Sequence, residues 1–261
     1  MKILLTGANG YIGMRVLPLL LDQGHEVVCA VRSADRLSVD KETKEKIEII
    51  EVDLLDDVQP NLFPRDIDAA YYLVHSMTSS NANFSSKEQI TAEHFNTYMK
   101  DTDVKQVIFL SGIVNEDNLS EHLESRKNVE SILYKGDYNL TVVRAGIIVG
   151  SGSASFEIIR DLCEKLPLMI TPKWVNTKCQ PIGIRDVLKF LTGVLGKPET
   201  YNDSFDIGGP DVLSYKDMMK GYAKVRGLKL TILNVPVMTP KLSSYWLYFV
   251  TSTSYKLAAN L

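Results

Sequence analysis

The segment Thr6–Gly13 reads TGANGYIG, directly after the short apolar run Lys2–Leu5 and at the start of the apolar-periodic segment Tyr11–Gln23. A strand, a glycine-rich turn and a helix are therefore expected in succession. Glycine permits a tight turn, lets the backbone approach a pyrophosphate and lets the helix pack closely on the strand. The helix N-terminus then presents N–H groups to an anion.

We interpret this turn as a dinucleotide-binding site. Its glycines follow the spacing GxxGxxG, whereas the general fingerprint is GxGxxG, and such a pattern by itself also occurs in ordinary glycine turns. The strand before the turn and the helix after it favour the dinucleotide. The cofactor contacts predicted here are Gly7, Asn9, Gly10, Tyr11, Ile12 and Gly13.

Short β-branched runs alternate with longer helical patterns over the first 150 residues. This alternation implies βαβ units and a parallel sheet, and right-handed crossovers favour the strand order 3-2-1-4-5-6. We therefore predict an α/β fold with a doubly wound parallel sheet, a Rossmann domain. The expected strands are Lys2–Leu5, Glu26–Val31, Ile47–Val52, Ala69–Val74, Gln106–Leu110 and Leu140–Val143, and the expected helices are Tyr11–Gln23, Ser85–Lys100 and Leu119–Tyr134.

The sequence changes in character after residue 150, where the small residues SGSAS are followed by segments that contain prolines. Helices are expected at Phe156–Lys165, Arg185–Leu195 and Tyr215–Arg226, and strands at Ser204–Ile207 and Leu228–Leu233. We predict an NAD(P)-binding Rossmann domain over residues 1–150 and a small, discontinuous C-terminal substrate lobe over residues 151–261. The lobe is expected to pack on the first domain as one structural unit.

Composition excludes several classes of protein. The 261 residues carry 29 Lys and Arg against 32 Asp and Glu, a net charge of −3, so nucleic-acid binding through a basic face is disfavoured. The three cysteines show no disulfide or metal-ligand spacing, and no metal site is predicted. No apolar run approaches the roughly 18 residues of a membrane span, and no secretory segment is recognisable. A cytoplasmic protein acting on a small molecule is expected.

The end of the second expected strand predicts which dinucleotide binds. NAD-binding proteins usually place Asp or Glu there for the ribose 2′-hydroxyl, whereas Arg accommodates a 2′-phosphate. Residues 27–34 contain no acid; Arg32 and Ser33 stand at this position instead. We therefore predict NADP(H) in preference to NAD(H). The alternative is that Arg32 is a solvated charge at a strand end.

At these residues the sequence resembles the short-chain dehydrogenase/reductase superfamily in its extended and atypical branches. The resemblance continues through Val52–Asp56 (VDLLD), Tyr71–Met77 (YYLVHSM), Phe109–Ile113 (FLSGI) and Val143–Phe156 (VRAGIIVGSGSASF), and then through Gln180–Val187 and Phe205–Tyr215. It covers nearly the whole chain and is nearest to a bacterial NAD(P)H-binding, sugar-epimerase-like group. Relatives are expected to continue beyond the final KLAANL, so the chain is interpreted as truncated or as a short relative.

The resemblance implies further cofactor contacts. Asp53 and Leu54 would contact the adenine, and Val74, His75 and Ser76 would flank the cofactor ribose. Ala145 and Gly146 would lie near the nicotinamide.

The superfamily's reductases and epimerases use a serine after the fifth strand and a YxxxK pair on the next helix. Aligned with that pattern, His122 stands at the tyrosine and Arg126 at the lysine, and the serine position falls on Gly112 or, one residue off, on Ser111. The usual proton-transfer triad is therefore absent or rebuilt. In one interpretation His122 is the acid/base, because imidazole titrates near neutrality, and Arg126 binds the ribose or a substrate anion. In the other, His122, Arg126 and Glu130 form a polar stripe without chemistry.

Three functions remain open. The first is an NADPH-dependent oxidoreductase acting on a carbonyl, quinone or nucleotide-sugar-like molecule. The second is a non-enzymatic NADP(H)-sensing regulatory or binding protein, which the altered triad favours. The third, a nucleotide-sugar epimerase or dehydratase, is weakened by the absence of Tyr and Lys. Fold by itself does not choose among them, because function belongs to the site.

Overall fold

A computed structural model describes residues 1–75, 84–113, 121–171 and 173–234. The chain divides into two compact units: Met1–Ala145 with Arg185–Asp206, and Gly146–Ile184 with the residues from Ile207 onward. The segment Arg185–Asp206 thus belongs to the first unit, although the sequence pattern assigns it to the C-terminal lobe.

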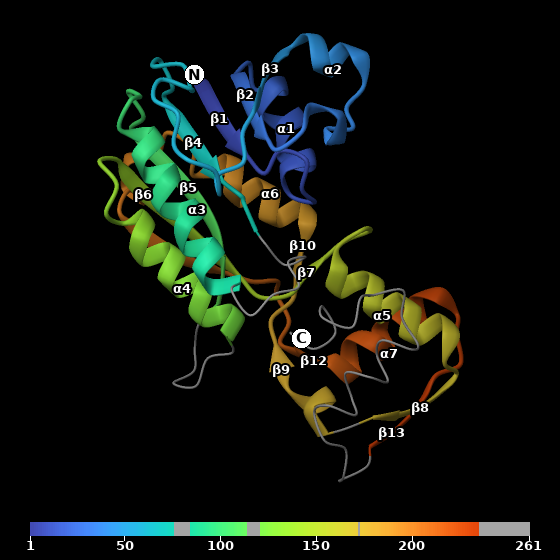
Figure 1. The fold of residues 1–261 in the computed structure, drawn as a ribbon. Helices are drawn as coiled ribbons and strands as arrows, with labels where there is room; N and C mark the ends of the chain where they lie inside the picture. Colours follow the sequence, from blue (N-terminus) through green and yellow to red (C-terminus); the bar gives the residue numbers. More distant parts are fainter. Residues whose placement is uncertain (76–83, 114–120, 172, 235–261) are drawn as a thin grey trace. The chain divides into compact units, whose positions relative to one another are not determined.

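The first unit is built on a seven-stranded sheet with the order β11-β6-β5-β4-β1-β2-β3 (Figure 1). The predicted doubly wound order 3-2-1-4-5-6 is confirmed, and β11 adds a strand beyond β6 that the prediction leaves out. Neighbouring strands among the first six pair in parallel. The strands are β1 (Lys2–Thr6), β2 (Glu26–Val31), β3 (Ile47–Glu51), β4 (Ala69–Tyr72), β5 (Gln106–Gly112), β6 (Asn139–Ala145) and β11 (Asp203–Ile207).

Helices cover the sheet because its strands are apolar on both faces, as parallel strands usually are. On one face Leu4 and Tyr72 join a core with α3 (Phe84–Met99) and α4 (Glu121–Leu133), which lie side by side (Figure 1). Because successive side chains alternate between faces, Tyr71 points to the other side, where its hydroxyl donates to the Leu191 carbonyl in α6 (Ile184–Gly193) at 2.9 Å.

The remaining elements of this unit are short, except for α1. Helix α1 (Gly13–Asp22) buries Val16, Leu17 and Leu20. The two charged connections that lack a clear helical pattern contain only the single turn η1 (Ala34–Arg36), the short helix α2 (Lys41–Glu45) and irregular backbone. A further turn, η3 (Pro198–Thr200), precedes β11.

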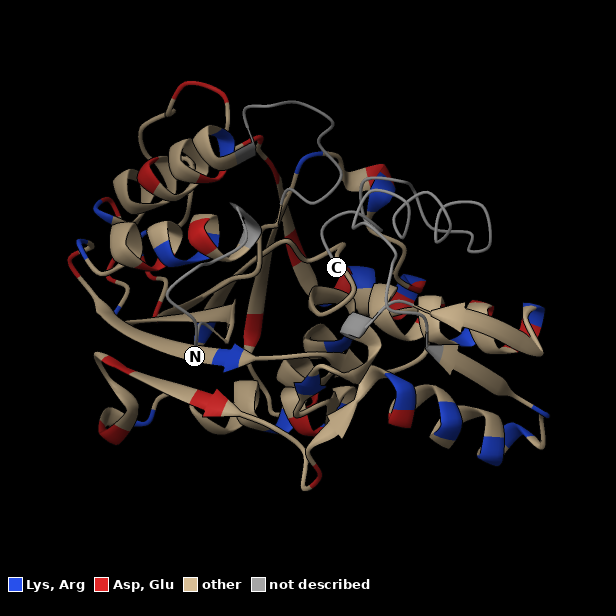
Figure 2. Ribbon diagram, turned by 90° about the horizontal axis from the view of Figure 1, so that it is seen from below, with Lys and Arg blue, Asp and Glu red and all other residues tan. Residues whose placement is uncertain are grey.

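The described part of the second unit, up to residue 234, packs two helices and three small strand pairs. Helix α5 (Ala154–Lys165) meets α7 (Tyr215–Arg226) through Ile158, Leu162 and Met219. Lys220 and Lys224 of α7 are exposed. Figure 2 draws lysine and arginine residues in blue along the ribbon. Strand β7 (Ile148–Val149) pairs with β10 (Ile182–Gly183), β8 (Leu168–Thr171) with β13 (Thr231–Asn234), and β9 (Lys178–Cys179) with β12 (Leu213–Ser214); the turn η2 (Lys173–Asn176) precedes β9.

The three helices predicted after residue 150 are observed as α5, α6 and α7, and α7 begins and ends at the predicted residues. The expected strand at Leu228–Leu233 is observed at Thr231–Asn234. Within the described ranges, no helix has the length and apolar character needed to cross a bilayer.

Candidate functional site

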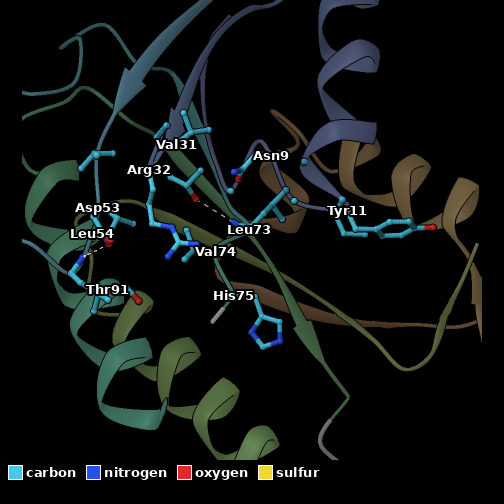
Figure 3. Close-up of a pocket in the computed structure, with 18 of the residues that line it drawn as sticks. Asn9, Tyr11, Val31, Arg32, Asp53, Leu54, Leu73, Val74, His75 and Thr91 are labelled. Carbon is cyan, nitrogen blue, oxygen red and sulfur yellow. Dashed lines mark hydrogen bonds between the residues drawn. The ribbon is translucent and has the colours of Figure 1, made fainter. Parts of the chain in front are cut away.

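A cavity of about 550 Å³ lies at the carboxyl ends of the parallel strands in the first unit. Ligands of open α/β sheets bind at this edge, at the point where the strand order reverses. Here that point is β1, which lies between β2 and β4. The cavity walls come from the turn after β1, the ends of β2 and β3, the segment after β4 and the first turns of α3 (Figure 3).

The glycine turn forms the floor beside α1, and its shape explains two of the glycines. Gly7 has a φ of 68°, and a Cβ there would stand 2.6 Å from the Leu73 carbonyl oxygen of the neighbouring strand segment. At Gly13, a Cβ would collide with the Gly7 carbonyl oxygen, so this glycine lets the helix start directly against the turn. The Gly10 N–H donates to the same oxygen at 2.9 Å and closes the turn.

The N-terminus of α1 is suited to an anion. The N-cap residue is Ile12, whose apolar side chain makes no capping hydrogen bond, and the first turn of the helix contains no acidic residue. The N–H groups of Met14 to Val16 already donate to the carbonyl oxygens of Gly10 and Ile12. The N–H groups of Ile12 and Gly13 just before them have no acceptor among the described residues, and the helix dipole favours negative charge there. A phosphate group meets both requirements.

Arg32 brings a positive charge to the cavity. It follows β2 directly, and its exposed side chain reaches over the cavity toward Val74 (Figure 3). Within the described ranges, no hydrogen bond or ion pair engages its guanidinium. Ser33 does not line the cavity, and beside it the Ala34 N–H donates to the Glu51 carboxylate at 2.5 Å.

The segment after β3 contributes Asp53 and Leu54 to the opposite wall (Figure 3). The Asp53 carboxylate accepts from the Leu55 N–H at 3.0 Å, and His94 Nδ1 lies 2.9 Å from the Leu54 carbonyl oxygen. Both bonds fix the backbone of this wall from within the chain. Leu54 and its neighbours line the side of this segment that faces the cavity.

A buried polar cluster adjoins the cavity below His75. The His75 Nδ1 lies 2.8 Å from one oxygen of Glu88 on α3, and the Ser125 hydroxyl on α4 donates to the other oxygen at 2.8 Å. Arg126 stands 3.7 Å from Glu88 and donates to the Leu110 carbonyl oxygen at 2.6 Å. Glu88 is only 2% exposed. Burial by itself would raise its pKa, but the hydrogen bond from His75 and the Arg126 charge outweigh burial and hold the pKa to about 2.

The residues predicted for catalysis are brought together only in part. Arg126 is buried, packs on the Phe109 ring and does not line the cavity. Ser111 is 6% exposed at the carboxyl end of β5, and its hydroxyl has no hydrogen-bond partner among the described residues. His122 stands in the first turn of α4, and its side chain lies outside the described part. Glu130 pairs with Arg144 of β6.

Most of the predicted cofactor contacts line the cavity. Ala145 ends β6 away from the lining, Gly146 begins the second unit, and Ser76 lies outside the described residues. The Tyr11 ring points away from Arg32 and His75 (Figure 3). The predicted residues found in the lining are Gly7, Asn9, Gly10, Tyr11, Ile12, Gly13, Arg32, Asp53, Leu54, Val74 and His75.

Two polar residues of α3 that line the cavity were missed from the sequence. Lys87 and Thr91 stand one turn apart on α3 and face the cavity. Their spacing of four residues is a signal for a shared helix face, but the sequence does not say which face meets the cavity. The apolar lining that was missed consists of Ala30, Val31, Val52, Leu55 and Leu73, and Thr6 completes the set.

The profile of a family described as NAD(P)H-binding matches residues 7–161, more than half of the chain. The chain belongs to this NAD(P)H-binding family. The match includes the glycine turn, Arg32, Asp53, His75 and both helices of the polar cluster. The resemblance to the atypical short-chain dehydrogenases/reductases is confirmed.

Two curated relatives are similar over most of the chain. The photosystem II assembly factor Ycf39 of Trieres chinensis is 24% identical, over 94% of this chain and 75% of its own length. The chloroplastic divinyl chlorophyllide a 8-vinyl-reductase of Arabidopsis thaliana is 21% identical, over 90% of this chain. The chain spans 60% of that reductase.

Solved structures share the fold. A nucleoside-diphosphate-sugar epimerase from Staphylococcus aureus aligns with a TM-score of 0.77 and 17% identity, over 99% of this chain and 88% of its own. The UDP-glucuronic acid 4-epimerase from Bacillus cereus in complex with NAD aligns with a TM-score of 0.74 and 18% identity, over 100% of this chain and 96% of its own. At these identities the likeness establishes the α/β architecture.

Proposed function

We propose that the chain is an NADP(H)-dependent oxidoreductase acting on a small carbonyl, quinone or nucleotide-sugar-like molecule. The observation that carries the cofactor preference is Arg32, an exposed guanidinium at the end of β2 that lines the cavity and has no carboxylate partner in the described ranges. A 2′-phosphate would satisfy this charge, whereas a 2′-hydroxyl would leave it to solvent.

The residues around the cavity fit the cofactor. The N–H groups that begin α1 would hold the pyrophosphate, and the turn at Gly7 and Gly13 lets the backbone approach it. Asp53 and Leu54 would bound the adenine, and Val74 with His75 would flank the second ribose. When bound, the cofactor supplies or accepts the hydride, and the protein supplies orientation and proton handling.

The substrate side of the proposal rests on two observations. The buried Ser111 hydroxyl lies at the carboxyl end of β5 without a partner in the described part, and a buried polar group of this kind favours a ligand partner. The named activity of the Arabidopsis relative is a reduction. His122, Ser111 and Arg126 stay the predicted catalytic groups, and a cytoplasmic location stays a prediction.

NADPH oxidation tests the reaction. The purified chain would be supplied with NADPH and a panel of quinones and aldehydes, and NADPH absorbance would be followed in wild type and in His122→Ala. Turnover that is lost in the variant supports the oxidoreductase with His122 as acid/base. Turnover that is kept removes His122 from the proposal.

Arg32→Gln tests the cofactor preference. A charge-assisted contact is worth about 1.5–3 kcal/mol, so NADPH affinity should fall roughly 10- to 100-fold while NADH affinity stays unchanged. Arg65→Gln is the matched control, because Arg65 is an exposed arginine whose ion pair with Asp103 lies at the surface. Equal NADPH and NADH affinities in wild type would contradict the preference.

A second candidate is a protein that binds NADP(H) and signals its redox state to a partner. The altered Tyr and Lys positions favour it, and one relative is named as an assembly factor. Tight NADPH binding together with an absence of turnover across the substrate panel would support this candidate over the enzyme.

A further inference from the structure

Strands β8 and β13 of the second unit lie side by side and form a parallel pair that is apolar on both faces (Figure 1). Successive side chains of a strand alternate between the faces, and Met169 and Ile232 pack on the core of the second unit. Leu168, Ile170 and Leu233 point the other way and are 55%, 53% and 51% exposed. Ile170 and Leu233 are register partners, and Leu168 precedes Ile170 by two residues on the same face.

These three side chains, Leu168, Ile170 and Leu233, make up what we call the apolar face of the strand pair. Single exposed apolar side chains are normal on a protein surface, whereas a contiguous group of them usually marks a contact surface. Each of the three is more than half exposed, so the described parts of the chain do not cover the face. The face therefore favours a partner from outside the described residues.

Lysines stand at both ends of the strand pair. Both strands begin at the same end, where Lys165 lies three residues before β8 and Lys229 two residues before β13. Lys165 pairs with Asp161 at 3.0 Å. Lys229 is exposed and has no ion-pair partner among the described residues. Lys173 follows β8 by two residues at the other end. The apolar face is thus bordered by an excess of positive charge.

The same sign of charge dominates the second unit in the sequence. This unit carries 11 Lys and Arg against 5 Asp and Glu, whereas the first unit carries 18 against 27. Residues 218–261 contain six Lys and Arg and no Asp or Glu. A net charge of −3 for the whole chain therefore hides two units of opposite sign, and a charge asymmetry of this kind favours an anionic partner for the basic unit.

The partner must offer an apolar layer for the three side chains and negative charge beside it for the lysines. The surface of an anionic bilayer has this order, because acyl chains lie directly beneath charged headgroups. Nucleic acid offers the charge without the apolar layer. The acid-free stretch also contains Tyr245–Val250 (YWLYFV), outside the described residues, and Trp and Tyr are enriched at membrane–water interfaces.

We propose that the apolar face of β8 and β13 docks on the surface of an anionic bilayer. Leu168, Ile170 and Leu233 enter the boundary between headgroups and acyl chains, and Lys229 lies among the headgroups. The inference concerns the second unit and does not depend on the proposed cofactor site in the first.

Sedimentation of the full chain with lipid vesicles tests the proposal. Wild type should bind vesicles of phosphatidylcholine with phosphatidylserine and bind vesicles of phosphatidylcholine more weakly. Ile170→Gln with Leu233→Gln should weaken binding to the anionic vesicles about tenfold or more, since each buried apolar side chain contributes to membrane affinity. Lys229→Gln should weaken it about fivefold, and added salt should reduce that difference.

Two variants of the first unit are matched controls. Ile90→Gln changes an exposed apolar side chain of α3, which is 37% exposed, and Lys41→Gln changes an exposed lysine of α2 whose ion pair with Glu45 lies at the surface. Both should bind the anionic vesicles as wild type does. Equal midpoints of thermal unfolding would show that all the variants are folded.

Three results would overturn the proposal. The first is that wild type binds neither kind of vesicle. The second is that Ile170→Gln with Leu233→Gln binds the anionic vesicles as tightly as wild type, because the association would then be electrostatic alone and a nucleic acid could replace the bilayer. The third is that wild type self-associates in sedimentation velocity, the double variant does not, and vesicles leave this unchanged, because the apolar face would then join two copies of the chain.

Discussion

Arg126 Nη2 donates to the Leu110 carbonyl oxygen at 2.6 Å, so a side chain of α4 binds the backbone of β5 near its carboxyl end. The same guanidinium stands 3.7 Å from Glu88. At the position that the sequence alignment assigns to the lysine of the YxxxK pattern, this chain therefore holds a buried cation whose described contacts are with the protein.

Replacing Arg126 should cost much more stability than replacing a surface arginine. Arg126→Met leaves Glu88 buried without its counter-charge, and breaking such a pair costs about 3–5 kcal/mol. Urea unfolding at neutral pH measures the loss. Arg65→Met, which breaks the exposed pair with Asp103, should cost about 1 kcal/mol or less. Equal losses of stability in the two variants would contradict a stabilising role for the buried pair of Arg126 and Glu88.

Glu88 should make the fold sensitive to acid. Its folded pKa of about 2 lies below the ordinary value of 4.5, so its contribution is complete above pH 4.5 and is lost as the pH falls toward 2. The difference corresponds to a contribution on the order of 3 kcal/mol. The free energy of unfolding, measured over this range, should fall less steeply in Glu88→Gln than in wild type. Parallel curves would contradict the low pKa.

Two glycines should respond to alanine with opposite signs. At Gly13 a Cβ would meet the Gly7 carbonyl oxygen and the Ala8 backbone, so Gly13→Ala should lose about 1–3 kcal/mol of stability. At Gly221, within α7, nothing lies within 4 Å of the added Cβ, so Gly221→Ala should gain about 0.5–1 kcal/mol. Thermal unfolding of both variants checks the pair. A stabilised Gly13→Ala would show that the turn has more room than its geometry allows.

The first unit was largely predictable from the sequence because buried parallel strands read as continuous apolar runs. Glu26–Val31 was predicted to the residue, and the glycine turn located the helix after β1. The return of Arg185–Asp206 to the first unit and the pairing of β11 with β6 were not predicted. A local sequence pattern predicts whether a segment is a helix or a strand, but not which distant segment it contacts. The Asn202 side chain, for example, accepts from the Leu140 N–H some sixty residues away.

The cavity was predictable where its residues follow strands, as Arg32, Asp53 and His75 do. The polar cluster behind His75 was not, because a charged residue within a helix is most often exposed and Glu88 carries no local sign of burial. The hydrogen-bond partners of Glu88, His75 and Ser125, stand 13 and 37 residues from it along the chain. The alignment that places Arg126 at a lysine position could not show that its guanidinium would bond to backbone carbonyl groups.

Calorimetric titration of the purified chain with NADPH and with NADH shows whether the cavity beside β1 holds a nicotinamide dinucleotide. The N-terminus of α1 and the Arg32 guanidinium, which has no partner among the described residues, predict saturable binding of both forms at one site, with NADPH bound roughly 10- to 100-fold more tightly. An absence of heat with either nucleotide, at two temperatures so that a chance zero enthalpy does not hide binding, would contradict it.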